Sequence, residues 1–176
     1  AAGSDRAVRL ALSAEALRAV VERGDPFAVE LATVRPQASE AGVFVLLEPF
    51  AATGVPNAEV LGRELVAIVR PLLRAVGESP RDGGVLDRLQ ANAEKLVRIR
   101  RIDETLRDDQ GATLARVEQR ALAADISGAL SELAKLPPAM RATAQGWITR
   151  AEARNKAIEA SRRFAVDAMA ALKSAQ

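Results

Sequence analysis

The sequence predicts an all-α protein, a helical bundle that contains a tetratricopeptide-like antiparallel helix pair and a long C-terminal helix. Alanine, the strongest helix former, supplies a large part of the 49% hydrophobic content. Aromatic residues make up only 3% of the chain, which argues against a β-sandwich or a β-barrel. Apolar residues recur every three or four positions, the period of an amphipathic helix. We divide the chain into an N-terminal helical region (1–78), a linker with an amphipathic basic helix (79–103), and a helical core (104–176).

The first helix is predicted over residues 5–23 and is ended by Gly24. The residues that share one of its faces are Val8, Leu12, Ala16, Ala19 and Val20. Asp25 is expected to cap a second helix over residues 27–34, with Pro26 at the first helical position.

Two further apolar segments follow. Residues 40–47 are apolar enough to enter the core, and the prolines and glycine of residues 49–56 predict a loop. Asn57 is expected to cap a long helix that reaches about Val76, and Pro71 should kink it or start a new turn. Its apolar stripe consists of Leu61, Leu65, Ile68 and Leu72.

The stretch from Gly77 to Gly84 is the clearest linker, and an amphipathic helix follows it. The helix is expected to stop near Arg98 or Ile99, because Arg100 would otherwise lie on its apolar face. A polar loop is then predicted from Asp103 to Gly111. The apolar face consists of Val85, Leu86, Leu89, Ala93, Leu96 and Val97.

The remaining residues predict three helices. Residues 112–123 and 126–136 form the antiparallel pair, with Asp125 as the cap between them. Pro138 opens the last helix, which runs to about Lys173. Its inward positions are Met140, Ala144, Trp147, Ala151, Ile158, Ala165, Met169 and Leu172, a stripe that is interrupted by Arg154 and Ser161. We expect the core residues to include Trp147, Leu114, Leu130 and Ile158.

The composition gives little support to catalysis. The chain has no His, Cys or Tyr, so we predict no enzyme activity, no catalytic residues and no cofactor. The acidic cluster of Asp103, Glu104, Asp108 and Asp109 could bind a hard cation, but the spacing of a calcium-binding loop is absent and solvated carboxylates explain it better. The 25 basic and 23 acidic residues are too balanced to indicate a nucleic-acid partner.

The basic end of the amphipathic helix is the strongest candidate for a binding surface. An apolar stripe flanked by cations is typical of a helix that lies on an anionic membrane. The alternative is a helix that buries the same stripe against its neighbours in a bundle. The predicted lipid-binding residues are Leu86, Leu89, Lys95, Leu96, Val97, Arg98, Ile99, Arg100 and Arg101.

Several of these stretches resemble the C-terminal mitofilin domain. The resemblance covers nearly the whole chain and rests on residues 83–101 and the acidic stretch after them, on 114–118, on Asp125 before Ile126, on 130–136, and on Trp147 before an Ala/Arg-rich helix. Residues 24–27 and 49–56 are similar to alphaproteobacterial members of the family. In this sequence Ala124 stands where the family often has Gly before the capping Asp.

The resemblance implies a non-enzymatic scaffold that shapes membranes at crista junctions or bacterial intracytoplasmic membranes. It implies anionic lipids as partners, self-association, and contact with the outer-membrane barrel-assembly machinery. It also implies an anchor in the inner membrane, with this domain facing the periplasm or the mitochondrial intermembrane space. No initiator Met is present, and we interpret the chain as a piece of a longer protein. The alternative function is a helical adaptor that binds a protein partner without lipid contact.

Overall fold

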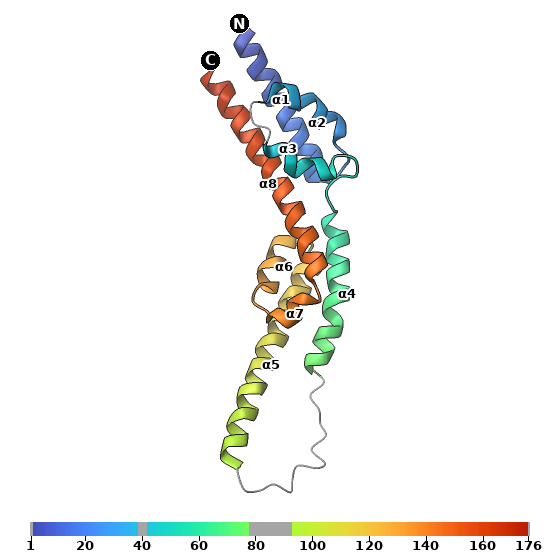
Figure 1. The fold of residues 1–176 in the computed structure, drawn as a ribbon, viewed down its shortest axis with the longest axis vertical. Coiled ribbons are helices and arrows are strands. Elements are labelled where there is room, and N and C mark those ends of the chain that lie inside the picture. Colours follow the sequence, from blue (N-terminus) through green and yellow to red (C-terminus); the bar gives the residue numbers. More distant parts are fainter. Residues whose placement is uncertain (1, 39–41, 78–92, 176) are drawn as a thin grey trace. The chain divides into compact units, whose positions relative to one another are not determined.

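The computed structural model describes residues 2–38, 42–77 and 93–175, and the side chains of Ala2 and of residues 93–104 lie outside that description. Within the described ranges the chain forms eight α-helices, two short 3-10 helices and no strand, which confirms the all-α prediction (Figure 1). The chain divides into two compact units, one of residues 1–57 with 149–176 and one of residues 58–148. The domain boundaries proposed from the sequence at 78 and 103 stay a prediction.

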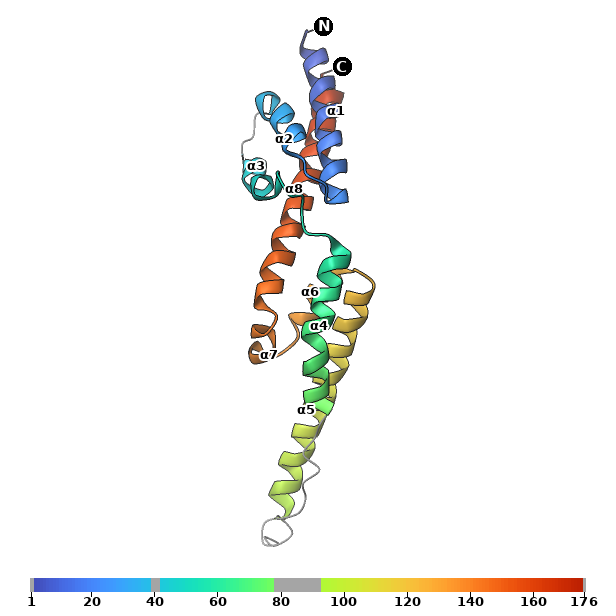
Figure 2. The same ribbon diagram turned by 90° about the vertical axis from the view of Figure 1, so that its right-hand side faces the viewer.

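The first unit is built from short helices packed on two long ones. It contains α1 (Ala2–Arg23), α2 (Ala28–Val34), α3 (Gly42–Leu47), the 3-10 helices η1 (Arg35–Gln37) and η2 (Glu48–Phe50), and α8 (Gln145–Ser174) from Thr149 onward. Figures 1 and 2 both show α1 beside the C-terminal half of α8. Its main core cluster consists of Leu17, Val21, Phe27, Leu31, Val34, Phe44, Leu47, Val55, Ala157 and Ile158.

The buried face of α1 differs from the apolar face that the helical wheel indicates. Ala14 packs against Ala165 and Ala168 of α8, whereas Leu12 is 68% exposed. The distance between two packed helices depends on the side chains at their contact, and small side chains such as alanine allow a close approach. The packed side of α1 therefore includes Ala11, Ala14, Leu17 and Val21, and it leaves Leu12 exposed.

The connection between α1 and α2 corrects the predicted cap. Gly24 ends α1 with a positive φ of 80°, as expected. Phe27, not Asp25, is the N-cap residue of α2, and no side chain caps that helix. The carboxylate of Asp25 instead accepts a hydrogen bond from Arg23, while the Phe27 N–H donates to the Ala51 carbonyl at 2.9 Å. The start of α2 is thus stabilised by a tertiary hydrogen bond to the 48–54 segment, where the sequence predicted a local side-chain cap.

The last helix is long but begins later than predicted. Pro138 opens a separate helix, α7 (Pro138–Ala142), and α8 starts at Gln145. The two polar residues on its inward stripe have hydrogen-bond partners. The Ser161 hydroxyl is buried and donates to the Ile158 carbonyl at 2.8 Å, and the half-buried Arg154 donates from Nε to the Pro56 carbonyl at 2.9 Å. Both residues therefore belong to the packed face instead of interrupting it.

The second unit contains α4 (Ala58–Gly77), α5 (Ala93–Leu122), α6 (Ile126–Leu133), α7 and the first residues of α8. Helices α4 and α5 run antiparallel, because Gly62 lies against Ala121 and Gly111 lies against Val76 (Figure 2). Helix α4 continues through Pro71 without a break. The fully buried large side chains of this unit are Leu61, Leu65, Val69, Leu114, Val117, Leu133 and Trp147.

The antiparallel pair of α5 and α6 is present, and its predicted cap is confirmed. The Asp125 carboxylate accepts a hydrogen bond from the Gly128 N–H at 2.9 Å. Trp147 is buried, and its indole N–H donates to the Leu61 carbonyl at 2.8 Å. Of the other expected core residues, Leu114 and Ile158 are buried and Leu130 is partly buried.

Candidate functional site

Helix α5 corrects two predictions about the basic segment. It runs without a break from Ala93 to Leu122, so the predicted end near Arg98 or Ile99 and the polar loop from Asp103 to Gly111 are wrong. The residues of that stretch include good helix formers and no proline. Residues 105–109 are exposed, so their polarity reflects a solvent-facing helix and not a loop.

The predicted lipid-binding residues fall partly inside this helix. Leu86 and Leu89 lie outside the described residues, and the segment from Lys95 to Arg101 occupies the first turns of α5.

The N-terminal part of α5 extends past the described end of α4. Because Gly111 lies beside Val76 and α4 ends at Gly77, residues 93–109 reach about 25 Å beyond it at a rise of about 1.5 Å per residue (Figure 1). From Thr105 to Asp109 every side chain is exposed, and Leu106 is 52% exposed. We call residues 93–109 the extension of α5.

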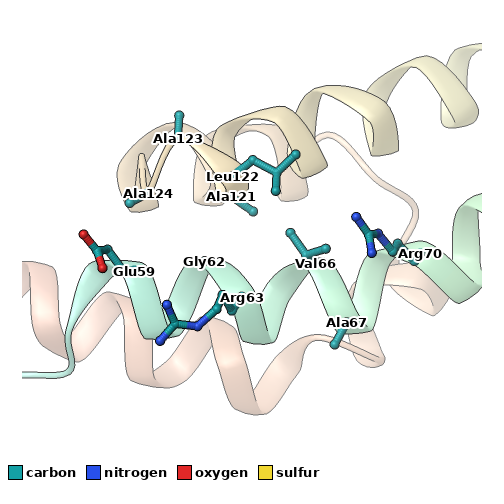
Figure 3. A pocket seen from close by; sticks show the side chains of 10 residues that line it. All are labelled: Glu59, Gly62, Arg63, Val66, Ala67, Arg70, Ala121, Leu122, Ala123 and Ala124. Atoms are coloured by element: carbon teal, nitrogen blue, oxygen red, sulfur yellow. The ribbon is translucent and has the colours of Figure 1, made fainter.

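A groove lies at the other end of the α4–α5 contact (Figure 3). It has a volume of about 670 Å³, and we call it the α4–α5 groove. Val66 and Leu122 face each other across its middle, with Leu122 68% exposed, and Glu59 and Arg70 lie at opposite ends. The other lining residues are Gly62, Arg63, Ala67, Ala121, Ala123 and Ala124.

The α4 side of the groove carries the carboxylate of Glu59 and the guanidinium groups of Arg63 and Arg70. Arg63, Arg70 and Arg74 are exposed and recur at spacings of seven and four, so they share one face of α4. Arg70 Nε is 2.9 Å from a carboxylate oxygen of Glu118, whereas Arg63 and Arg74 have no ion-pair partner among the described residues. The sequence interpretation missed this surface, although the spacing of these arginines could have indicated it.

A second hollow, in the first unit, lies between α3 and α8 and has a volume of about 730 Å³. Its apolar side chains include Val43, Leu46 and Phe164. Its rim mixes both signs of charge, with Lys156 and Glu159 among its residues. This balance favours no particular class of charged partner.

Two carboxylates hold helices together through ion pairs. Glu22 of α1 accepts hydrogen bonds from Arg162 of α8 at 2.6 Å and from Arg18 at 2.7 Å. The hydrogen bond from Arg162, with a contribution from Arg18, lowers the pKa of Glu22 below its ordinary value of 4.5. In the second unit Glu132 pairs with Lys135 and Arg116, and these hydrogen bonds lower its pKa. Both carboxylates tie elements of the fold together.

Among the described residues, no three His, Cys, Asp or Glu side chains come close enough to hold a metal ion. In the same part of the chain, none of the helices combines the length and the apolar character needed to cross a membrane.

No protein-family model, no curated protein and no solved structure matches the chain.

Proposed function

We propose that this protein is a non-enzymatic scaffold that binds anionic membrane surfaces and self-associates to organise inner-membrane invaginations and membrane contact sites. The observation that carries the proposal is the extension of α5, a helix about 25 Å long that begins with a basic segment. Residues 93–102 contain Lys95, Arg98, Arg100 and Arg101 against the single acidic residue Glu94. Their net charge is therefore 4 − 1 = +3.

The strength of such a contact can be bounded. Each cation near an anionic leaflet contributes about 1 kcal/mol, so four cations would give a weak and salt-sensitive attachment. Guanidinium groups add bidentate hydrogen bonds to phosphate oxygens. Several copies held on one membrane would bind much more firmly than one copy, because each further contact becomes intramolecular. Weak binding by one copy therefore suits a scaffold that acts as an assembly.

The resemblance to the mitofilin family supports the cellular part of the proposal. We propose that the domain faces the periplasm or the mitochondrial intermembrane space, that an inner-membrane anchor belongs to the full-length protein, and that the outer-membrane barrel-assembly machinery is a further partner.

Co-sedimentation with vesicles tests the membrane proposal. The parent chain and an Arg98→Glu/Arg100→Glu/Arg101→Glu variant would be mixed with vesicles of neutral lipid and of neutral plus anionic lipid at low salt. The matched control, Arg6→Glu/Arg9→Glu/Lys173→Glu, makes the same change in net charge at exposed positions of the first unit.

We expect the parent and the control to sediment with anionic vesicles only, and the α5 variant to stay in the supernatant. Binding that is unaffected by the α5 reversals and by rising salt would contradict the proposal. The α4–α5 groove supports the second candidate, a helical adaptor, because Leu122 is exposed in its lining and exposed apolar surface is typical of a protein-binding site. A parent chain that binds no vesicles would leave that candidate in place.

A further inference from the structure

We propose that two copies of the chain pair across the hollow between α3 and α8, with their α8 helices antiparallel. We call it the α3–α8 hollow, and all of its lining residues belong to the first unit. The inference rests on the proposed function in one respect, self-association, and it names the surface that would carry it.

The wall of the α3–α8 hollow is apolar and partly exposed. Helix α3 contributes Val43 and Leu46, and Leu46 is 42% exposed. Phe164 lines the α8 side, and its ring packs edge-on against the buried Phe44 of α3 with the ring centroids 5.9 Å apart. Figures 1 and 2 both show α3 beside α8. The hollow is therefore already formed in one copy, and its exposed apolar surface is typical of a binding site.

Four charged side chains of α8 line the hollow, and their signs alternate along the helix. Lys156, Glu159, Arg163 and Asp167 are all exposed. Their spacings of three, four and four residues place them on one face of α8. Two cations and two anions favour neither an acidic nor a basic partner, so the order of the signs matters more than their sum.

This order of signs is complementary to itself when two copies of α8 run in opposite directions. A two-fold axis at the level of Ser161 places Lys156 opposite Asp167 of the other copy, because the two positions are five and six residues from Ser161. The same axis places Glu159 opposite Arg163, since each is two residues from Ser161. Two-fold symmetry repeats both pairs. A parallel pair in register would instead bring like charges together, which is unfavourable.

These charges are only weakly paired within one copy. Arg163 Nε and a carboxylate oxygen of Asp167 are 3.9 Å apart, and the two side chains are 83% and 63% exposed. Lys156 and Glu159 have no ion-pair partner among the described residues. Exposed ion pairs contribute little to stability, so a second copy can recruit all four side chains.

The apolar wall lies at the level of the same axis. The residues of α8 that line the hollow run from Asn155 to Asp167, and Ser161 is the middle of that stretch. An axis at this level therefore brings the two hollows together, and each apolar wall is shielded from water by the other copy. Such an isologous contact closes as a dimer. It uses residues of the first unit alone, so the basic segment of α5 takes no part in it.

A charge-swap experiment tests the pairing on the whole chain, without vesicles. Lys156 and Asp167 are eleven positions apart on α8, about 16 Å at the helical rise, so their side chains cannot pair within one copy. Sedimentation velocity would give the dimer dissociation constant of the parent, of Lys156→Glu, of Asp167→Lys and of the double variant. Circular dichroism would establish that each variant is folded.

The controls make the same changes outside the hollow. Lys173→Glu and Asp5→Lys reverse single charges at exposed positions of the first unit. Leu46→Lys tests the apolar wall, and its control is Val29→Lys at a 76% exposed position of α2.

We expect each single reversal to raise the dissociation constant at least about tenfold, because like charges then meet at two symmetry-related places. The double variant joins opposite charges again at both places, so its dissociation constant should return to within about threefold of the parent value. Leu46→Lys should raise the constant at least about tenfold, since it places an ammonium group in an apolar contact. Rising salt should weaken the parent dimer, and the three controls should dimerise as the parent does.

Four results would overturn the inference: a parent that stays monomeric, single reversals that leave the dissociation constant unchanged, a folded double variant that binds no more tightly than the single ones, or a Leu46→Lys variant that dimerises as the parent does. A parent that dimerises but ignores these changes would keep self-association and lose this surface. Because no vesicles are present, these outcomes are separate from the test of membrane binding. A chain that dimerises as described but ignores anionic vesicles would contradict only the membrane part of the proposed function.

Discussion

The turn between α5 and α6 contains a residue, Ala124, whose backbone conformation is unfavourable for alanine. Ala124 has a φ of 54° and is the one non-glycine residue with a positive φ among the described residues. Its backbone N–H donates to the Ala121 carbonyl, and Asp125 then caps α6. Alanine in this left-handed conformation is strained, because its Cβ crowds the following carbonyl oxygen. The turn is therefore maintained by its hydrogen bonds and not by the preference of the residue within it.

Replacing Ala124 with glycine should stabilise the fold. Relief of the left-handed strain outweighs the greater freedom of glycine in the unfolded chain, so we expect a gain of about 0.5–1 kcal/mol. Urea unfolding followed by circular dichroism would measure it. The matched control, Ala115→Gly at an exposed position inside α5, should instead cost about 1 kcal/mol. A loss of stability in Ala124→Gly would contradict the strain argument.

Among the elements, α4 and α5 approach each other closely at Gly62. A Cβ atom placed on Gly62 would lie 2.3 Å from the carbonyl oxygen of Ala121. The two backbones therefore meet at a point where only glycine fits. This contact forms the closed side of the α4–α5 groove, whose lining includes both residues.

Gly62→Ala should destabilise the second unit even though alanine is the better helix former. The helix would gain about 1 kcal/mol from propensity, but overpacking against a backbone oxygen costs about 1–3 kcal/mol and forces the helices apart. We expect a net loss of about 1–2 kcal/mol in the free energy of unfolding. Gly146→Ala in α8 is the control, since nothing lies within 4 Å of its Cβ position and its stability should not fall. Equal stability of both variants would show that α4 and α5 are not so tightly apposed.

Over the whole molecule, charge is balanced in total but segregated locally. The formal net charge is +2, whereas residues 93–102 carry four cations and one carboxylate, and residues 103–109 carry four carboxylates and one cation. Overall charge therefore does not explain the proposed membrane contact. The carboxylates of Glu22 and Glu132 have guanidinium or ammonium partners that lower their pKa values. The free energy of unfolding therefore depends on the pH in acid.

The Glu22→Gln substitution should make the free energy of unfolding decrease less as the pH falls. Because the pKa of Glu22 is lower in the folded chain than in the unfolded chain, the charged group stabilises the fold above a pH of about 4.5. That contribution disappears as the pH falls through the lowered folded-state value. We expect the variant to be less stable than the parent near neutral pH and to differ least at the acid end.

Urea unfolding at several pH values between about 7 and 3 would measure the effect. Glu152→Gln, an exposed carboxylate on α8 without an ion pair in the described residues, is the control and should follow the parent curve. Parallel curves for Glu22→Gln and the parent would contradict a stabilising role for the pairs with Arg162 and Arg18.

The all-α class, the antiparallel pair, the Asp125 cap and the stop at Gly24 could be predicted from the sequence alone. Each depends on helix propensity, apolar period or the chemistry of one residue next to its neighbours. The break after α7 was missed, because the prolines marked a helix start but not the second start at Gln145. The continuity of α5 was missed as well, because a polar helix and a polar loop have similar composition.

The sequence by itself determined that the fold is all-α, where several helices stop, and that a basic segment precedes an acidic one, since these properties belong to neighbouring residues. Only the tertiary structure decided that α1 packs through Ala14 and not Leu12, and that Arg154 and Ser161 face inward with carbonyl partners. It alone also placed Arg63 beside the turn that follows Leu122. The physical reason is that burial and complementarity depend on which surfaces meet, and residues distant in the chain supply the other half of each contact.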